Sequence, residues 1–240
     1  MRTVIWGANG AMGQLLQKAL GEEVCGLVSL DGEKGVAKNA QELPDVKPEA
    51  VIDFSHHSAV AEVTAYAVSQ GCPLVIGTTG HTEEEQALIY AAAEKIPVFY
   101  SHNMSLGIAV LCRIAKEAAA CFPEADIEIL EIHHNRKVDA PSGTAHMLFE
   151  ALQEVRPEAV KVCGRAGEGK RQKKEIGIAS LRMGNVVGVH EVHICTPSQT
   201  LTLRHEAANR GMFADGAVEA ARFLQGKAPG LYTMQDFLER

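Results

Sequence analysis

The N-terminal part of the chain alternates short apolar runs with stretches of helical periodicity, and this alternation restricts the possible folds. The apolar runs contain few polar side chains, which is typical of strands buried on both faces of a sheet. Strands separated by helices pair in parallel, because each helix returns the chain to the end of the sheet at which the previous strand began. Strands are predicted at residues 3–6, 24–30, 50–54, 73–76 and 96–100, with helices at 14–20, 59–69 and 83–95.

The pattern changes after Ser105, where helices become rarer and turn sequences more frequent. Turns at 183–185 and 197–199 favour antiparallel pairs. Helices are predicted at 107–122, from Ser142 onward and at 213–224, and strands at 126–133, 175–182, 188–194 and 200–206. The sequence therefore predicts an α/β protein with an N-terminal Rossmann-type parallel sheet and a second α+β domain with a mostly antiparallel sheet.

This change of pattern also suggests the domain organisation. We expect a dinucleotide-binding domain over residues 1–104, with the C-terminal segment 213–240 packing back on it. Residues 105–212 are expected to form a substrate-binding and oligomerisation domain. There is no internal repeat and no low-complexity segment.

Composition excludes several classes of protein. The chain has 240 residues, 46% of them hydrophobic, which is ample for a buried core, and a net charge of -7 that disfavours nucleic acid and membrane partners. No apolar run could span a bilayer, and no signal peptide is indicated. The six cysteines are widely spread, which favours reduced thiols in a cytoplasmic protein. The short basic cluster at 170–174 indicates a solvated loop.

Three glycines, Gly7, Gly10 and Gly13, join the first strand to the first helix. A turn with little side chain lets a pyrophosphate approach the backbone, and the helix N-terminus offers free N–H groups and a partial positive charge. The common fingerprint has its second glycine one place earlier, at Asn9, which also tolerates a left-handed conformation. A tight structural turn is the alternative, but the position at the start of the alternation favours a nucleotide site.

Asp31 follows the second strand, where an acid usually binds the adenosine ribose. A simple turn acid is the alternative. Lys34 and Lys38 lie close by and would favour a 2′-phosphate instead, so the choice between NADH and NADPH stays open.

Two further strand ends carry polar, turn-forming residues, at 77–80 and 101–104. Ligands of open parallel sheets bind outside the carboxyl ends of the strands, where these loops are expected. Thr78, Thr79 and Asn103 could bond a nicotinamide amide or a ribose, although ordinary loop chemistry would also explain them.

The richest segment chemically is 131–145, in which His133 and His134 precede Lys137 and a Pro-Ser-Gly-Thr helix start. Neighbours in a strand point to opposite sides, so the two histidines need not share a role. Ser142 fits a helix cap, and the N–H groups of Gly143 and Thr144 would form a nest for a carboxylate. Each residue has an ordinary structural explanation, but their concentration suggests an anionic substrate that receives a proton.

At this segment the sequence resembles the dihydrodipicolinate reductase family, and the resemblance covers essentially the whole chain. The long motif through 131–145 is highly specific to that family, whereas the glycine turn is not. The other matching segments are 7–13, 53–55, 77–80, 103–105 and 213–217. The resemblance implies reduction of 4-hydroxy-tetrahydrodipicolinate, a dicarboxylate, by NADH or NADPH, and a homotetramer assembled through sheets of the second domain.

The resemblance also implies residue roles. His133 matches the catalytic histidine, Lys137 the proton donor, and His134 a substrate-binding position. Gly143 and Thr144 match the backbone cradle for a substrate carboxylate. Cofactor contacts are implied for Gly7, Ala8, Asn9, Gly10, Ala11, Met12, Gly77, Thr78, Thr79, Ser101, His102, Asn103 and Met104. Some family members have an acid followed by arginine where this chain has Ser29 and Leu30, which leaves the cofactor preference open.

Three other hypotheses remain. Another two-domain nicotinamide reductase of an anionic imine or aldehyde would share the glycine turn but would not need the histidine–lysine segment. A metal enzyme would use the pairs His56/His57 or His190/His193, but the latter pair is predicted to point to opposite faces of a strand. A nucleotide sensor without catalysis would need no proton donor.

Overall fold

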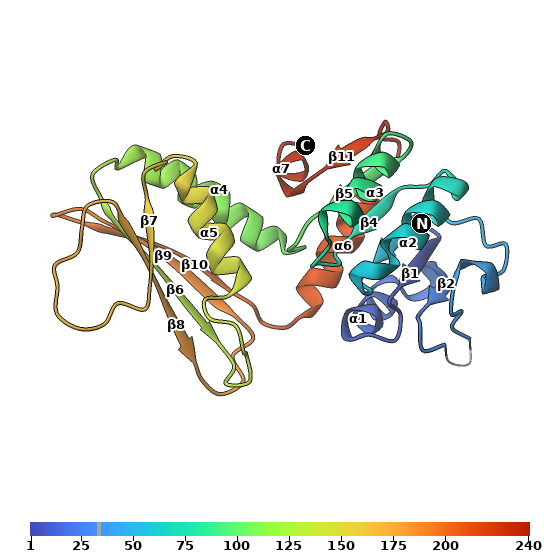
Figure 1. Ribbon diagram of the computed structural model, residues 1–240, viewed down its shortest axis with the longest axis horizontal. Helices are drawn as coiled ribbons and strands as arrows, with labels where there is room; N and C mark the ends of the chain where they lie inside the picture. Colours follow the sequence, from blue (N-terminus) through green and yellow to red (C-terminus); the bar gives the residue numbers. More distant parts are fainter. Residues whose placement is uncertain (33–34) are drawn as a thin grey trace. The chain divides into compact units, whose positions relative to one another are not determined.

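The computed structural model describes residues 1–32 and 35–240, and the described chain divides into two compact units (Figure 1). The first unit consists of Met1–Ser105 together with Arg210–Arg240, and the second of Leu106–Asn209. Among the described helices, none is both long enough and apolar enough to cross a membrane.

The first unit is built on a six-stranded sheet of order β11-β5-β4-β3-β1-β2 in which every neighbouring pair is parallel. The sequence predicts the first five strands but not the short sixth, which the C-terminal segment supplies. The strands are β1 (Thr3–Trp6), β2 (Val24–Val28), β3 (Ala50–Asp53), β4 (Leu74–Ile76), β5 (Pro97–Tyr100) and β11 (Gly230–Tyr232). The predicted parallel sheet is therefore confirmed.

Helices cover both faces of this sheet, which explains why its strands are apolar throughout. Ile5, Ile52 and Phe99 belong to one core cluster, which includes residues of α1 and α6, whereas Val4 and Val98 belong to the other, with residues of α2 and α3. The helices are α1 (Ala11–Leu20), α2 (Val60–Gln70), α3 (Glu83–Ala93), α6 (Gly211–Phe223) and α7 (Met234–Leu238).

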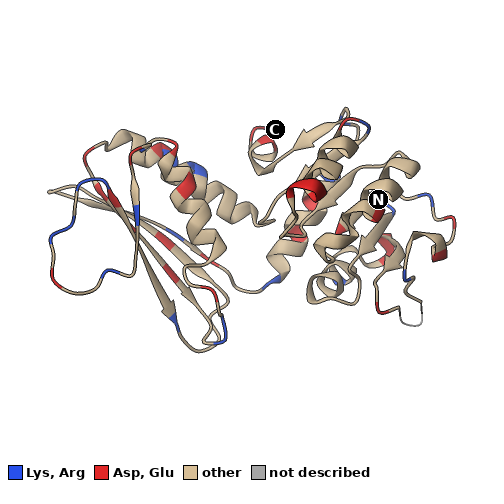
Figure 2. Cartoon of the chain, viewed as in Figure 1, with Lys and Arg blue, Asp and Glu red and all other residues tan. Residues whose placement is uncertain are grey.

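Local sequence fixes several helix ends. The Thr82 side chain accepts a hydrogen bond from the N–H of Glu85, whose carboxylate bonds the Thr82 N–H in return. Three glutamates occupy the first turn of α3, coloured red in Figure 2, where the helix dipole favours negative charge. Gly71 ends α2 in the left-handed conformation.

The second unit contains a five-stranded mixed sheet of order β10-β9-β6-β8-β7. β9 pairs antiparallel with β6 and β10, whereas β8 pairs parallel with β6 and β7. The sequence does not predict β7. The elements are α4 (Leu106–Cys121), β6 (Asp126–His133), α5 (Gly143–Gln153), β7 (Val160–Cys163), β8 (Glu175–Arg182), β9 (Val189–Cys195) and β10 (Thr200–Glu206). The predicted α+β fold of the second domain is confirmed, with parallel pairs added.

One face of this sheet changes character along its strands. Ile127 and Ile129 of β6 pack in a core cluster with residues of α4 and α5. Because side chains alternate along a strand, Glu131 and His133 continue on the same covered face, and both are buried. His190 of β9, opposite Glu131, is buried as well. This end of the covered face therefore brings three buried polar side chains together, whereas the other end is apolar.

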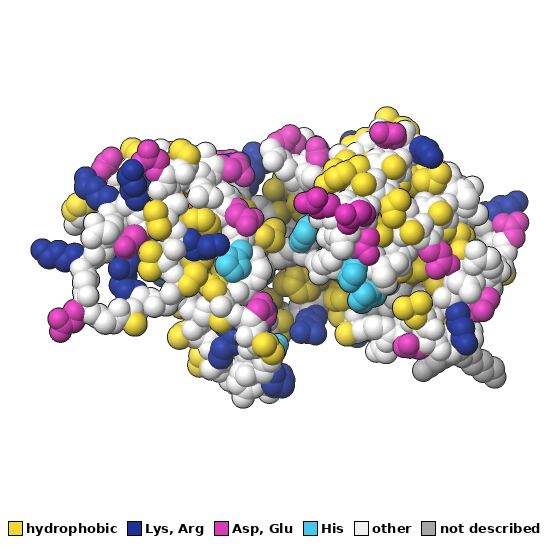
Figure 3. All heavy atoms as spheres, in the orientation of Figure 1, with side chains coloured by type: hydrophobic (Ala, Val, Ile, Leu, Met, Phe, Trp, Pro, Cys, Tyr) yellow, Lys and Arg dark blue, Asp and Glu magenta, His cyan; other side chains and the backbone are white. Residues whose placement is uncertain are grey.

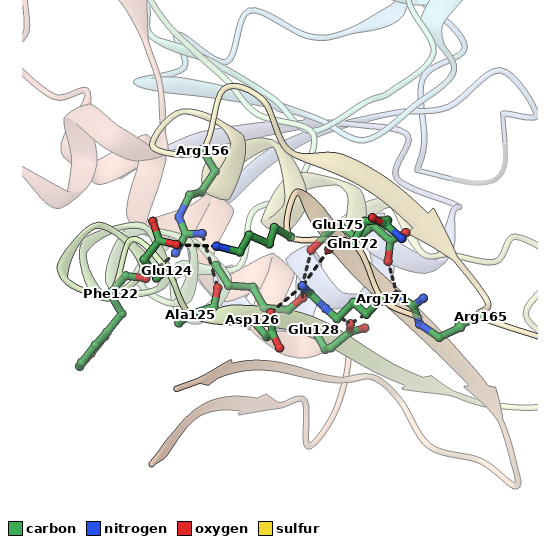
Figure 4. Close-up of polar contacts among 12 residues, drawn as sticks. Phe122, Glu124, Ala125, Asp126, Glu128, Arg156, Arg165, Arg171, Gln172 and Glu175 are labelled. Atoms are coloured by element: carbon green, nitrogen blue, oxygen red, sulfur yellow. Dashed lines mark hydrogen bonds and ion pairs between the residues drawn. The ribbon is translucent and has the colours of Figure 1, made fainter. Parts of the chain in front are cut away.

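The opposite end of the β6–β8 pair is fastened by Arg171 (Figure 4). Its guanidinium forms ion pairs with Asp126 at 2.7 Å and Glu128 at 3.2 Å, and it donates to the carbonyls of Ile127, Gln172 and Glu175. Arg171 is therefore not the solvated loop residue predicted from the sequence. The prediction was wrong because its acidic partners on β6 are distant in the sequence.

Candidate active site

The glycine turn lies at the carboxyl end of β1, where the sheet order reverses between β2 and β3. Gly7 has φ of 82°, and a Cβ there would lie 2.2 Å from the Phe54 carbonyl oxygen. At Gly13 a Cβ would lie 2.2 Å from the carbonyl oxygen of Gly7. Two of the three glycines are thus required by close backbone approach, and they keep the turn open at the usual ligand site of such sheets.

The turn also presents polar groups suited to a phosphate-bearing ligand. The Nδ2 of Asn9 is buried without a hydrogen-bond partner among the described residues. Gly10, which precedes α1, makes no side-chain cap, so the first turn of the helix keeps backbone N–H groups available. A glycine cradle, an orphaned amide and a helix N-terminus together fit a dinucleotide.

A buried carboxylate organises the next two strand ends. Asp53, at the end of β3, accepts hydrogen bonds from the hydroxyl of Ser55 at 2.5 Å and that of Thr78 at 2.7 Å. Burial raises the pKa of Asp53 to about 6, although these hydrogen bonds oppose the rise. Because the Thr78 hydroxyl proton is already bound to Asp53, this side chain supports the loop from within. Thr79, which follows, is exposed.

The loop after β5 is anchored in a similar way. The Ser101 hydroxyl donates to the Asn103 carbonyl at 2.8 Å, and the Asn103 side-chain oxygen accepts from the Ser105 N–H at 2.9 Å. Met104 is 1% exposed and packs in the core, so its side chain fixes the loop. His102 is exposed, with its ring 5.2 Å from that of Tyr100.

Asp31 lies in an exposed turn after β2, and Lys38 is exposed as well. Lys34 lies outside the described residues. The aliphatic part of Lys38 packs against Gly32, where a Cβ would lie 2.4 Å from its Cγ.

Replacing Gly13 by valine is expected to weaken dinucleotide binding about 10- to 100-fold, because the added side chain would collide with turn backbone. Calorimetric titration with NADH and NADPH would measure the loss. Gly169→Val is a suitable control, since a Cβ at Gly169 has no neighbour within 4 Å. Unchanged affinity in Gly13→Val would mean that the turn does not bind the nucleotide.

In the second unit, Glu131 is the centre of the polar cluster, and it is 0% exposed. Its carboxylate accepts from the His133 Nδ1 at 2.5 Å and from both terminal nitrogens of Arg182 at 2.8 Å. The Ser142 N–H adds a bond of 3.1 Å. Burial alone would raise the pKa of Glu131, but the hydrogen bonds from His133 and Arg182 outweigh it and hold the pKa well below its ordinary value. Glu131 is therefore ionised, and the His133 Nδ1 carries a proton.

This arrangement leaves the other nitrogen of His133, Nε2, for chemistry. A Cβ at Gly188 would lie 3.1 Å from Nε2, so the glycine keeps the space beside it open. The ring of His190 lies 5.1 Å from that of His133, and its Nε2 is 3.0 Å from the Ser142 hydroxyl. Burial, reinforced by the nearby His133, lowers the pKa of His190 to about 3, so His190 is neutral. A buried carboxylate behind a histidine is the arrangement that orients general acids and bases.

Gly188→Ala is expected to lower kcat about 10-fold while preserving the fold, because the methyl group would crowd the His133 Nε2 without backbone strain. Steady-state kinetics and thermal melting would separate the two effects. Gly169→Ala, at an open position, should leave both unchanged. Normal turnover in Gly188→Ala would indicate that the substrate does not use this space.

Lys137 and the start of α5 lie on the segment that follows β6. The Lys137 ammonium is 2.7 Å from a carboxylate oxygen of Asp139. The Ser142 side chain caps α5 by accepting from the Ala145 N–H at 3.2 Å, as the sequence predicts. Gly143 is exposed and Thr144 half-buried in the first turn, where backbone N–H groups and the helix dipole favour an anion.

The candidate residues thus fall into two sets. His133, His134, Lys137, Gly143 and Thr144 are close in sequence in the second unit, whereas the proposed cofactor residues gather at the carboxyl edge of the parallel sheet of the first. Within the described residues, no group of three or more His, Cys, Asp or Glu side chains could hold a metal ion.

The sequence suggests no role for Arg182, Gly188 or Glu131, and suggests His190 only as a possible metal ligand. For Glu131 a signal existed, since residues two apart in a strand share a face. For the other three, only the pairing of β6 with β8 and β9 brings them beside His133.

A parallel sheet with a glycine cradle at its switch point, followed by a sheet unit with a carboxylate–histidine pair, defines the class of two-domain nicotinamide-dependent oxidoreductases. Models of two domain families match nearly the whole chain: "Dihydrodipicolinate reductase, N-terminus" over residues 1–104 and "Dihydrodipicolinate reductase, C-terminus" over residues 107–238. The chain belongs to the dihydrodipicolinate reductase family.

Individual relatives agree with this assignment. The chain is 42% identical over 252 residues to a 4-hydroxy-tetrahydrodipicolinate reductase of Caldanaerobacter subterraneus, covering 100% of this chain and 99% of the relative. A 4-hydroxy-tetrahydrodipicolinate reductase of Campylobacter jejuni is 42% identical, with 98% and 97% covered. The structure of a dipicolinate-bound dihydrodipicolinate reductase from Paenisporosarcina sp. TG-14 matches with a TM-score of 0.81 and 26% identity over 99% of each chain.

Proposed function

We propose that this protein reduces 4-hydroxy-tetrahydrodipicolinate to tetrahydrodipicolinate with NADH or NADPH, in lysine and diaminopimelate biosynthesis. Family membership over the whole chain supports the reaction. The observation that carries the proposal is the buried, ionised Glu131 that holds the Nδ1 proton of His133, on the segment that also bears Lys137 and the start of α5.

The side chains have distinct roles in this proposal. A hydride and a proton enter the substrate and water leaves, so an acid must be placed at the reacting atoms. His133, through Nε2, and Lys137 are the two candidates for this acid. The N–H groups of Gly143 and Thr144 bind one substrate carboxylate, and His134 contributes to binding the dianion.

When bound, the reduced nicotinamide supplies the hydride. We assign its binding to the residues at the carboxyl edge of the parallel sheet, from the glycine turn to the loops after β4 and β5. Backbone groups there carry most of the binding, since the Thr78 and Met104 side chains are used internally. Asp31 favours the free ribose of NADH, whereas Lys38 favours a 2′-phosphate.

A coupled assay tests the function. Dihydrodipicolinate synthase would generate the unstable substrate in place, and loss of reduced nicotinamide absorbance would be followed with NADH and NADPH separately. Synthase-dependent oxidation supports the proposal, and the ratio of the two rates gives the cofactor preference. If the protein binds nucleotide but oxidises neither cofactor in this assay, two hypotheses remain: a reductase of another anionic imine or aldehyde, or a nucleotide sensor.

We also propose that the protein is a cytoplasmic homotetramer assembled through the second sheet. Its six cysteines are all unpaired, as expected in a reducing compartment. The sheet face opposite α4 and α5 carries apolar side chains, including Leu181, which is 45% exposed, and Val160, which is 55% exposed. Elsewhere, apolar and charged side chains are interspersed on the visible face of the molecule (Figure 3). Sedimentation of the native chain and of Leu181→Glu would test this, since the charge should dissociate the assembly.

A further inference from the structure

Arg182 ends β8 directly beside His133, which ends β6 in the parallel register. Each terminal nitrogen of its guanidinium donates two hydrogen bonds. One donates to Glu131 and to the Leu181 carbonyl at 2.7 Å, and the other donates to Glu131 and to the Asp139 carbonyl at 2.6 Å. The side chain is only 19% exposed, so these bonds are largely shielded from water.

The two hydrogen bonds from Arg182 to Glu131 affect His133. A bidentate arginine fixes the plane of the Glu131 carboxylate, and this carboxylate in turn holds the His133 Nδ1 proton. Arg182 also offsets the cost of burying the carboxylate, because a fully buried carboxyl without a cation tends to become protonated. A protonated Glu131 would no longer be a full acceptor for the imidazole.

The hydrogen bond from Arg182 to the Asp139 carbonyl affects Lys137. The bond from Arg182 to the Asp139 carbonyl fixes the backbone of the residue whose carboxylate holds the Lys137 ammonium at 2.7 Å. Asp139 is otherwise exposed, with 60% of its side chain accessible. A single guanidinium thus restrains the supports of both proposed acid–base residues.

We infer that Arg182 is a positioning residue that aligns His133, through Glu131, and Lys137, through Asp139, so that the two act on one substrate. This inference rests on the proposed function for the roles of His133 and Lys137. Lysine could not replace Arg182, because a point charge lacks the planar fork that spans the Glu131 carboxylate and the Asp139 carbonyl together.

Arg171 provides a matched control on the same pair of strands. It also forms two ion pairs and several carbonyl bonds, at the opposite end of β6 and β8 (Figure 4). Loss of either arginine removes a comparable set of interactions from the unit. Of the two arginines, Arg182 contacts Glu131 and Asp139, and Arg171 does not. Comparing Arg182→Ala with Arg171→Ala therefore separates lost stability from lost alignment.

The experiment compares full-length Arg182→Ala, Arg182→Lys and Arg171→Ala with the parent protein. We expect kcat to fall about 100-fold in both Arg182 variants with a smaller change in KM, and to change little in Arg171→Ala. Added guanidinium should restore part of the kcat of Arg182→Ala, whereas sodium chloride at the same ionic strength should not.

The pH profile gives a second readout. Arg182 is one of the hydrogen-bond donors that hold the pKa of Glu131 low against the effect of burial, so its loss should raise this pKa. Activity requires ionised Glu131, so the acid-side loss of kcat should move to higher pH in Arg182→Ala and stay in place in Arg171→Ala. Equal kcat losses in the two alanine variants, with unshifted profiles and no rescue, would overturn the inference.

Nitrogen NMR of the histidine side chains tests the same point without turnover. The protonated Nδ1 of His133 should be visible in the parent protein and in Arg171→Ala, and should change in Arg182→Ala. If the parent protein failed to reduce the substrate, the proposed function would be wrong, but this spectrum would still decide whether Arg182 controls His133. An unchanged His133 signal in Arg182→Ala would refute that control.

Discussion

Glu131→Gln is expected to lower kcat about 1000-fold, the largest effect of any conservative substitution in the second unit. The carboxylate receives donors only, from His133, Arg182 and Ser142. An amide nitrogen at the position of Oε2 would face the His133 Nδ1, which would reverse the tautomer of His133 or rotate its ring. At the position of Oε1 it would face Ser142 and Arg182 and displace the group that supports His133. Steady-state kinetics with saturating cofactor would measure the change.

Glu128→Gln is the control for this experiment. Glu128 lies on the same strand and also pairs with arginines, but its side chain is 44% exposed. Both variants should melt at lower temperature than the parent, and more so for Glu131→Gln, because a buried Arg182 would lose its counter-charge. If kcat fell equally in the two variants, the role assigned to Glu131 would reduce to stability.

The second large effect is expected for Lys137→Ala. Its kcat should fall about 100- to 10,000-fold while its cofactor affinity stays the same. The ammonium is one of the two candidate proton donors and the nearest full positive charge to the α5 cradle in sequence, so both proton transfer and charge neutralisation would suffer. Single-turnover kinetics would measure the chemical step, and calorimetry would measure cofactor binding.

Lys116→Ala is the matched control, since Lys116 forms an ion pair of 2.8 Å with Glu154, similar to that of Lys137 with Asp139. It should retain parental kinetics. Loss of turnover and of cofactor affinity in equal measure in Lys137→Ala would show that the lysine supports the structure as a whole rather than the reaction.

Much of the fold could be predicted because periodicity is a local property. Three strands of the second unit, β6, β8 and β10, begin and end at the predicted residues, and the cap at Ser142 is in place. β7 and β11 were missed, since each is short and largely exposed or half-buried, which leaves little pattern to detect. The parallel pairing of β6 with β8 was also missed, because register depends on contacts between distant segments.

The candidate site was predictable only where its residues are neighbours in the chain. His133, Lys137 and the α5 cap could be read from one motif. Arg182 and Gly188 could not, because strand pairing alone brings them to His133. In the cofactor loops, the residue types suggested ligand contacts, but the hydrogen bond from the Thr78 hydroxyl to Asp53 could not be read from the sequence, because the two residues lie on different strand ends.

The covered face of the second sheet has a consequence for how such a protein can change. Its strands carry isoleucines such as Ile127 and Ile176 at one end and the acid–base residues at the other. Substitutions at the reactive end therefore remove little of the apolar contact that maintains the domain. Because the two ends are separate, substitutions that change substrate preference can accumulate at the reactive end. The apolar end still supplies the stability that offsets their destabilising effects.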